Sequence, residues 1–201
     1  MYIHGQGGNA DEAAHYRPLF PEHEVIGLDY TAETPWEAVR EFPERFDALC
    51  GERPTILIAN SIGAFFAMSA LSGKPVTRAY FISPVVDMER LILDMLSWAG
   101  VTEEALREEG EIETAFGQTL SWDYLTYVRA HPLCWTAPTT ILYGGGDRLI
   151  ARNTVAAFAE RTGAVLTVME RGEHWFHTEE QMRFLDDRIR TSEAEFSRQV
   201  L

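Results

Sequence analysis

A serine between small residues stands out in the segment Ala59-Asn60-Ser61-Ile62-Gly63. The apolar run before it predicts a strand buried on both faces, and the apolar run after it predicts a buried helix. A serine on a sharp strand-to-helix turn exposes its hydroxyl oxygen, and small residues two positions away on either side allow close packing. Average composition gives a serine such neighbours by chance about 1% of the time. The interpretation of Ser61 as a candidate nucleophile therefore depends on the strand predicted before it and the helix predicted after it.

A glycine-rich loop, His4-Gly5-Gln6-Gly7-Gly8, follows the first predicted strand. Such a loop can turn its N–H groups inward, because no Cβ blocks the required backbone conformations. The loop lacks the Lys-Ser/Thr of a P-loop and does not match GxGxxG, which argues against a phosphate site. Together with Ser61 it predicts an oxyanion hole formed by the backbone N–H groups of Gln6 and Ile62. We expect His4 to brace the loop rather than to act as a base.

Two more polar motifs follow the last two predicted strands, first Tyr143-Gly144-Gly145-Gly146-Asp147 and then Gly172-Glu173-His174-Trp175-Phe176. In chain order, HGQGG, ANSIG, LYGGGD and GEHWF resemble the four landmarks of the α/β-hydrolase superfamily. The resemblance covers the chain except for residues 84–136. It implies a catalytic triad in which Ser61 is the nucleophile, His174 the base and Asp147 the acid that orients the base. It also implies a reduced sheet, because the antiparallel strands that precede the first glycine loop in larger members are missing.

Other residues compete for the acid and base roles. Asp87 lies shortly after the fourth predicted strand, where some relatives of this fold carry the acid, but it is also well placed to cap a helix that begins at Met88. His177 lies beside the capping box of the closing helix, where a structural role is expected. The remaining histidines, His15, His23 and His131, form no metal-ligand pattern. We therefore favour Asp147 and His174.

The elements that would position these residues alternate along the chain, which predicts an α/β fold: a doubly wound, mostly parallel, six-stranded sheet. The predicted strands are Met1–His4, Glu24–Leu28, Thr55–Ala59, Arg78–Ile82, Thr139–Tyr143 and Ala164–Met169. The predicted helices are Asn9–Tyr16, Thr34 to Gly51 with a kink or break at Pro43, residues 62–72, Asn153–Thr162 and a closing helix from Thr178. Capping boxes at Thr34 and Thr178 support two of these helix starts.

Residues 84–136 interrupt the alternation. They contain no convincing strand, and the patterns at Asp87–Ala99 and Thr102–Glu109 predict helices. A connection this long exceeds what neighbouring strands need, so we expect a helical lid over one end of the sheet, within a single domain of residues 1–201. Its tryptophans, Trp98 and Trp122 among them, are expected either to form the lid's own core or to line an apolar pocket above Ser61.

The amino-acid composition indicates which binding partners and which cellular compartment are expected. The net charge of −14 repels phosphate backbones and anionic membrane surfaces, so neither nucleic acid nor a membrane is an expected partner. Cys50 and Cys134 form no disulfide framework or metal pattern, which favours a reducing compartment. No secretory leader or membrane-spanning run is recognisable, so we expect a cytoplasmic location. The sequence leaves the oligomeric state open, a homodimer included.

The implied chemistry is acyl transfer to water on a small-molecule substrate, a small carboxylic ester, with neither a metal nor an organic cofactor. The same triad also serves thioesterases, amidases, aminopeptidases and acyltransferases, because the pocket selects the leaving group and the acceptor. A protein that keeps the fold and only binds a ligand is the alternative from another class. An intact set of nucleophile, acid, base and glycine loop argues against it.

Overall fold

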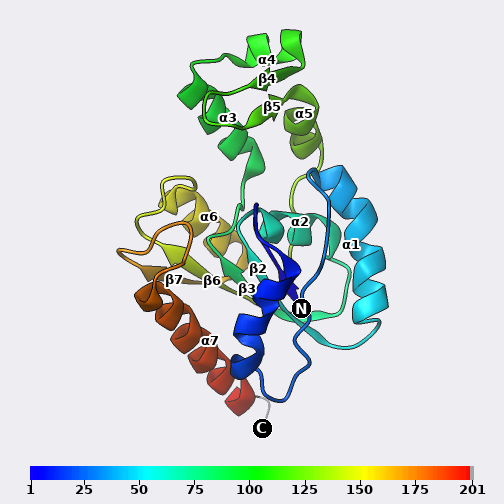
Figure 1. The fold of residues 1–201 in the computed structure, drawn as a ribbon, viewed down its shortest axis with the longest axis vertical. Helices are drawn as coiled ribbons and strands as arrows, with labels where there is room; N and C mark the ends of the chain where they lie inside the picture. Colours follow the sequence, from blue (N-terminus) through cyan, green and yellow to red (C-terminus); the bar gives the residue numbers. More distant parts are fainter. Residues whose placement is uncertain (200–201) are drawn as a thin grey trace.

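The computed structural model describes residues 1–199, and its centre is a parallel five-stranded sheet with the order β1-β2-β3-β6-β7 (Figure 1). The strands are β1 (Tyr2–Ile3), β2 (Thr55–Asn60), β3 (Val76–Ile82), β6 (Thr139–Gly144) and β7 (Val165–Met169). All neighbouring strands in it pair in parallel. The carboxyl ends of the strands therefore meet at one edge of the sheet, where the predicted site residues follow β1, β2, β6 and β7.

The predicted strand Glu24–Leu28 is wrong, and the sheet has five strands rather than six. This segment forms only an isolated bridge between Gly27 and Tyr2. Two backbone hydrogen bonds with Tyr2 hold it beside β1, and β1 itself is two residues long. Gly27 also passes so close to the 10–19 helix that a Cβ would lie 2.0 Å from the carbonyl oxygen of Ala10. Because β1 is so short and Gly27 lies against the Ala10 backbone, this segment cannot form a longer row of backbone hydrogen bonds with β1.

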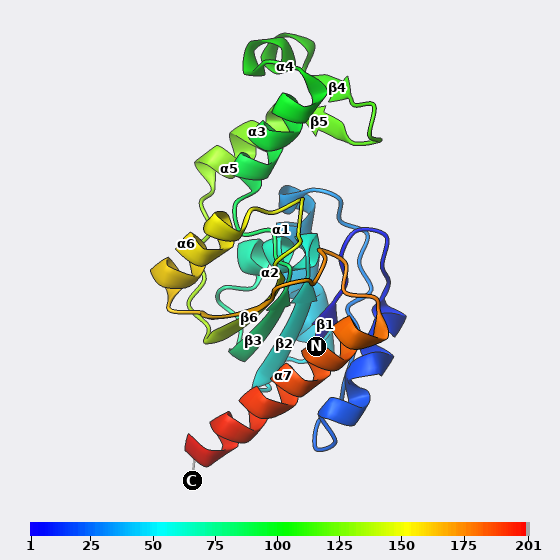
Figure 2. The same cartoon turned by 90° about the vertical axis from the view of Figure 1, so that its left-hand side faces the viewer.

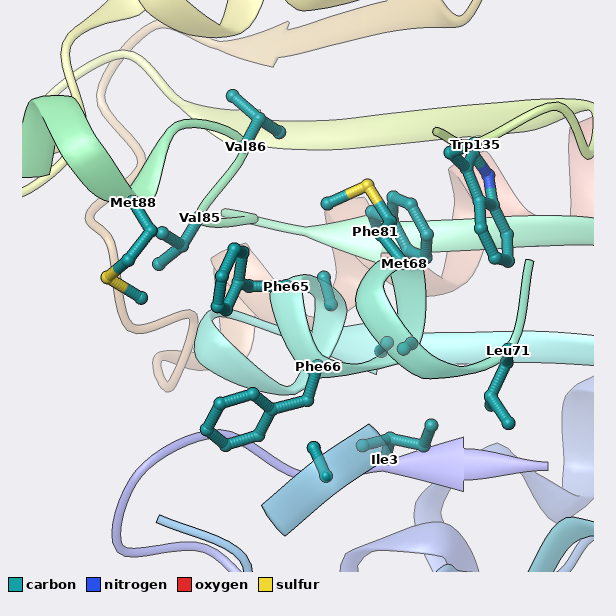
Figure 3. Close-up of a cluster of buried hydrophobic side chains, with 14 of the residues drawn as sticks. Ile3, Phe65, Phe66, Met68, Leu71, Phe81, Val85, Val86, Met88 and Trp135 are labelled. Atoms are coloured by element: carbon teal, nitrogen blue, oxygen red, sulfur yellow. The ribbon is translucent and has the colours of Figure 1, made fainter. Parts of the chain in front are cut away.

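Helices cover both faces of the sheet. They are the 3₁₀ helix η1 (Ala10–Leu19), α1 (Pro35–Leu49), α2 (Ile62–Ala70), α6 (Arg152–Thr162) and α7 (Glu179–Gln199). Alternate strand residues point to opposite faces, and buried Leu57 and Ala59 accordingly pack with α1, α2 and α6, whereas Ile58 packs with η1 and α7. Figure 3 shows part of the first core, with Phe66 on the side of Ile3 and Phe65 on the side of Val85 and Met88.

The predicted helix starts at Thr34 and Thr178 are confirmed. The Thr34 hydroxyl accepts from the N–H of Glu37, and the Glu37 carboxylate accepts from the N–H of Thr34, which is the reciprocal bonding of a capping box. Thr178 and Gln181 exchange the same pair of bonds. The predicted break at Pro43 is wrong, because α1 continues through it. The apolar face of α1, with Phe42 and Phe46 fully buried, offsets the one backbone hydrogen bond that proline removes.

Residues 84–136, here called the insertion segment, extend beyond the carboxyl edge of the sheet as a separate layer (Figures 1 and 2). The segment contains α3 (Met88–Ala99), α4 (Glu103–Glu109), α5 (Trp122–Ala130) and an antiparallel hairpin of β4 (Glu111–Glu113) and β5 (Thr119–Ser121). The prediction that it contains no strand is wrong. Each strand is three residues long and mostly polar, too short for an alternating pattern to be recognised.

Buried leucines and one arginine join the helices of the insertion segment. Leu106 and Leu125 are fully buried, and α3 packs against α5. The Arg129 guanidinium on α5 pairs with Glu89 on α3 at 2.7 Å and with Glu103 on α4 at 2.6 Å. Among residues 1–199, no helix of the protein is both long and apolar enough to cross a membrane.

Candidate active site

Ser61 lies at a strained turn between β2 and α2. Its φ of 52° and ψ of −120° are conformations that residues with a Cβ rarely adopt, and they persist only when the surroundings enforce them. The Ser61 N–H donates to the carbonyl of Ile82 at 2.9 Å, and the Ser61 carbonyl accepts from the N–H of Val85 at 3.1 Å. The last residue of β3 and the segment just after it therefore hold the turn in place.

Gly63 explains why a small residue follows Ser61 at this spacing. A Cβ at Gly63 would lie 2.2 Å from the carbonyl oxygen of His4, so α2 can start here only because that atom is absent. Ala59, two positions before the serine, is fully buried in β2. The close approach of helix and strand that the sequence predicts is present.

A chain of two hydrogen bonds joins the three predicted triad residues. The Ser61 hydroxyl lies 2.9 Å from Nε2 of His174, and Nδ1 of His174 lies 2.7 Å from a carboxylate oxygen of Asp147. With Nδ1 donating to the carboxylate, Nε2 is left to accept from the serine hydroxyl. The Asp147 side chain is 0% exposed and the His174 side chain 22% exposed, so the acid is enclosed while the base reaches solvent.

The glycines before Asp147 let the two loops pack against each other. A Cβ at Gly144 would lie 2.4 Å from the carbonyl oxygen of Glu173, and one at Gly145 would lie 2.6 Å from that of Glu170. The N–H of Gly146 donates to the carbonyl of Gly172 at 2.8 Å. This backbone contact brings Asp147 and His174 within hydrogen-bond distance.

The other oxygen of Asp147 is held by its own loop. It accepts from the backbone N–H groups of Leu149 at 2.8 Å and Ile150 at 3.0 Å. Sequence reasoning did not assign these positioning groups. The signal was present, since an aspartate that follows a strand and precedes a helix commonly accepts from N–H groups two and three residues later.

The predicted oxyanion residues lie beside Ser61 on two elements. Ile62 is the first residue of α2, and Gln6 belongs to the loop after β1. A Cβ at Gly5 would lie 3.2 Å from Cβ of Ser61, so the glycine loop lies directly against the candidate nucleophile. Within residues 1–199, the N–H groups of Gln6 and Ile62 donate no hydrogen bond. They are available to an oxygen atom of a ligand.

The competing residues have structural partners. Asp87 caps α3, accepting from the N–H of Arg90 at 2.9 Å. His177 donates its backbone N–H to the side-chain oxygen of Gln181 at 2.9 Å, and its ring stacks on Trp175. His4 is buried and stacks on Tyr30, whose hydroxyl donates to the His4 carbonyl, so it braces the glycine loop.

Trp98 and Trp122 lie on two different helices of the insertion segment, α3 and α5. Trp98 is near the end of α3, 51% exposed, with its ring edge against Phe116. Trp122 begins α5, is half-buried and packs against the main core. No ring contact joins the two indoles within residues 1–199, and their role as a pocket wall stays a prediction.

Two buried hydroxyl groups lie near the carboxyl edge of the sheet. Tyr143 donates to the carbonyl of Ile150 at 2.6 Å, and burial, reinforced by the charge of Asp147, raises the pKa of Tyr143 to about 12. Ser83 is fully buried at the end of β3 with a φ of 41°, and its hydroxyl has no partner within residues 1–199. Residues 1–199 also contain no cluster of three potential metal ligands.

The fold resembles those of several solved structures. Alpha/beta hydrolase domain-containing protein 10 from mouse superposes with a TM-score of 0.79 at 16% identity, covering 97% of this chain and 89% of that one. Est1E from Butyrivibrio proteoclasticus gives 0.69 at 16% identity, with 96% and 86% covered. A thioesterase domain from the curacin biosynthetic pathway gives 0.55 at 16% identity, with 94% and 89% covered. At sequence identities this low, these superpositions show a common fold and nothing further about this chain.

Sequence comparison gives the family. No curated protein matches this sequence. A family model described as the alpha/beta hydrolase family, however, matches residues 3–187, a range that includes the glycine loop, the serine turn and the loops that carry Asp147 and His174. The chain belongs to the alpha/beta hydrolase family.

Proposed function

We propose that the protein is a serine hydrolase that cleaves a small carboxylic ester through an acyl-enzyme. The observation that carries the proposal is the hydrogen-bonded chain from Ser61 through His174 to Asp147, built on a strained turn at the carboxyl edge of a parallel sheet. Substrate chemistry in doubly wound folds takes place at this edge. An aspartate at the position of Ser61 would indicate dehalogenase or epoxide-hydrolase chemistry instead.

The geometry supports a two-step mechanism. In the first step His174 removes the proton of Ser61 as the serine oxygen attacks the carbonyl carbon, and the alcohol leaves with that proton. The N–H groups of Gln6 and Ile62 stabilise the negative oxygen that forms, and Asp147 holds the imidazole in the required tautomer. In the second step His174 activates a water molecule, which releases the acid and restores the serine.

A thioester is the second candidate for the scissile bond. One of the similar folds belongs to a thioesterase domain, and the triad does not distinguish the two leaving groups. Matched oxygen and sulfur esters of the same acid would separate the candidates, because only the leaving atom differs.

The activity of Ser61 is tested by labelling with a fluorophosphonate and by turnover of a panel of esters. The native protein is expected to react with the probe at Ser61, whereas Ser61→Ala should not react and should lose turnover by a factor on the order of 10⁶. Ser69→Ala is the matched control, because Ser69 lies in the last turn of α2 and its hydroxyl donates to the Phe65 carbonyl at 2.8 Å. A native protein that neither reacts nor turns over any ester would instead be a ligand-binding protein on this fold.

A further inference from the structure

The loop that carries Gln6, one of the two predicted oxyanion donors, is a tight turn. The N–H of Gly8 donates to the carbonyl of Gly5 at 3.1 Å, and Gly7 between them has a φ of 75°. The turn begins against Ser61, because a Cβ at Gly5 would lie 3.2 Å from Cβ of the serine. An oxyanion hole is effective only when its donors are held in place before the reaction. The direction of the Gln6 N–H therefore depends on what holds the two ends of this turn.

The two ends of the turn are held by different side chains. At the first end, the Tyr30 hydroxyl donates to the His4 carbonyl at 2.8 Å. At the second end, the Glu12 carboxylate lies against the backbone, since a Cβ at Gly8 would lie 2.7 Å from one of its oxygens. The same oxygen accepts from the N–H of Asn9 at 3.2 Å. Glu12 thus fixes the point where the chain leaves the turn.

Glu12 is itself held by a buried hydroxyl group. Helix η1, blue in Figure 1, packs beside β1, and the Tyr2 hydroxyl on β1 donates to the second carboxylate oxygen of Glu12. Tyr2 is 2% exposed. Burial, and next the bond to Glu12, raise the pKa of Tyr2, so its hydroxyl keeps the proton that it donates. A hydrogen bond from a buried donor to a carboxylate is among the stronger ones in proteins.

Tyr2 also connects Glu12 to the strand that carries the candidate nucleophile. Tyr2 pairs with Ile58 on β2, and the two side chains belong to the same core on the η1 side of the sheet. Asn60, two residues further along β2, presents its side chain to that side as well. It contacts the Tyr2 hydroxyl, and this contact lowers the pKa of Tyr2 by less than burial and Glu12 raise it. Since Asn60 directly precedes Ser61, the Tyr2 hydroxyl lies between the glycine turn and the serine turn.

We infer that Tyr2 and Glu12 are positioning residues of the oxyanion hole, and that the bond between them keeps the Gln6 N–H directed at the oxygen that becomes negative at Ser61. The inference rests on the proposed function, because it concerns that oxygen. The capping box of η1 accounts for the bond between Glu12 and the Asn9 N–H. It does not account for the bond to Tyr2, which a helix cap does not need.

Removing the Tyr2 hydroxyl tests the inference. Tyr2→Phe should lower kcat for 4-nitrophenyl hexanoate by about tenfold and leave KM nearly unchanged. It should weaken inhibition by 1,1,1-trifluoroheptan-2-one by a similar factor, because the adduct of this ketone with a serine carries the same negative oxygen. The loss is smaller than the roughly 10²–10³-fold effect of removing a donor, since the N–H is only displaced. Tyr16→Phe is the matched control, because the Tyr16 ring lies 5.2 Å from that of Tyr2 in the same core, and its kinetics should equal those of the native protein.

A double variant tests whether the two residues act through one bond. Glu12→Ala should also lower kcat, and adding Tyr2→Phe to it should lower kcat no further, because the hydroxyl has already lost its acceptor. Losses that multiply in the double variant would overturn the inference. So would a Tyr2→Phe protein that is less stable in urea but has native kcat and native inhibition by the ketone, since the hydroxyl would then serve only folding.

A measurement without catalysis separates this inference from the proposed function. An active native protein whose kcat does not change in Tyr2→Phe would overturn the positioning role and leave the hydrolase intact. If the native protein neither turns over an ester nor reacts with a phosphonate, the proposed function fails, and hydrogen exchange of the Gly8 amide, followed by NMR, decides whether the bond holds the turn. This amide should exchange faster in Tyr2→Phe than in the native protein and in Tyr16→Phe. Equal exchange rates in the three proteins would overturn the inference.

Discussion

Glycine has different uses at the carboxyl edge of the sheet and in the insertion segment. At the sheet edge, a Cβ at Gly63, Gly144 or Gly145 would lie 2.2 to 2.6 Å from a carbonyl oxygen of a distant loop. In the insertion segment, Gly100 and Gly110 have nothing within 4 Å of a Cβ, and their φ values are 68° and 79°. The first set is required by neighbours far along the chain, and the second by the local backbone conformation. The candidate site therefore depends on long-range packing, whereas the insertion segment is shaped largely by its own turns.

The largest difference between the two regions is expected in kcat, when an aspartate at the sheet edge and one at the start of the insertion segment are each replaced by asparagine. Asp147→Asn should lower kcat by a factor on the order of 10⁴, because an amide cannot hold the imidazole in the tautomer that accepts the serine proton. Asp87→Asn should leave kcat nearly unchanged and cost at most about 1 kcal/mol of stability, since asparagine is itself a good helix cap. Steady-state kinetics and urea unfolding of both variants measure the difference. A larger kinetic loss in Asp87→Asn would assign the acid to the end of β3.

A second pair of variants compares a glycine required by close packing, Gly63, with a glycine required by its turn conformation, Gly110. Gly63→Ala should cost about 3 kcal/mol of unfolding free energy and slow phosphonate labelling, because the new methyl group meets the His4 carbonyl behind the candidate nucleophile. Gly110→Ala should cost about 1 kcal/mol and leave labelling unchanged, since only its φ resists a side chain. Urea unfolding and labelling rates test both. Equal stability losses with equal labelling would contradict the distinction between packing and turn glycines.

The smallest expected effect concerns the two tryptophans predicted to line a pocket. Trp122→Ala should shift the preferred acyl length by several-fold in relative kcat/KM, because an apolar wall acts through the area it buries. Trp98→Ala should shift it less, since the Trp98 ring is half exposed and packs on Phe116. A series of acyl lengths, measured beside labelling of Ser61 with a small phosphonate, tests this. If both profiles match the native one while the Tm falls, the tryptophans serve only the core of the insertion segment.

The sequence predicted the residues at the sheet edge better than the elements around them. Ser61, Asp147 and His174 are joined in a chain of hydrogen bonds because each follows a strand of the parallel sheet, and parallel strands place their carboxyl ends together. Their catalytic roles stay a prediction. The strand at Glu24–Leu28 was wrong because pairing depends on the length of β1 and on the contact of Gly27 with Ala10, neither of which local hydropathy reports. The β4–β5 hairpin escaped recognition because three-residue polar strands have no pattern to detect.

The insertion of residues 84–136 between two adjacent strands also bears on how the chain folds. Strands β3 and β6 pair along four residues each, and the whole insertion segment must be looped out before they meet. The entropy lost on closing a flexible loop grows with the logarithm of its length, about 0.6 kcal/mol for each doubling. A segment that folds early through its local contacts, with α3 against α5, shortens the flexible loop to the residues at its two ends. Early folding of the insertion segment would thus lower the entropic barrier to completing the sheet, and slow refolding is the expected result of weakening its core.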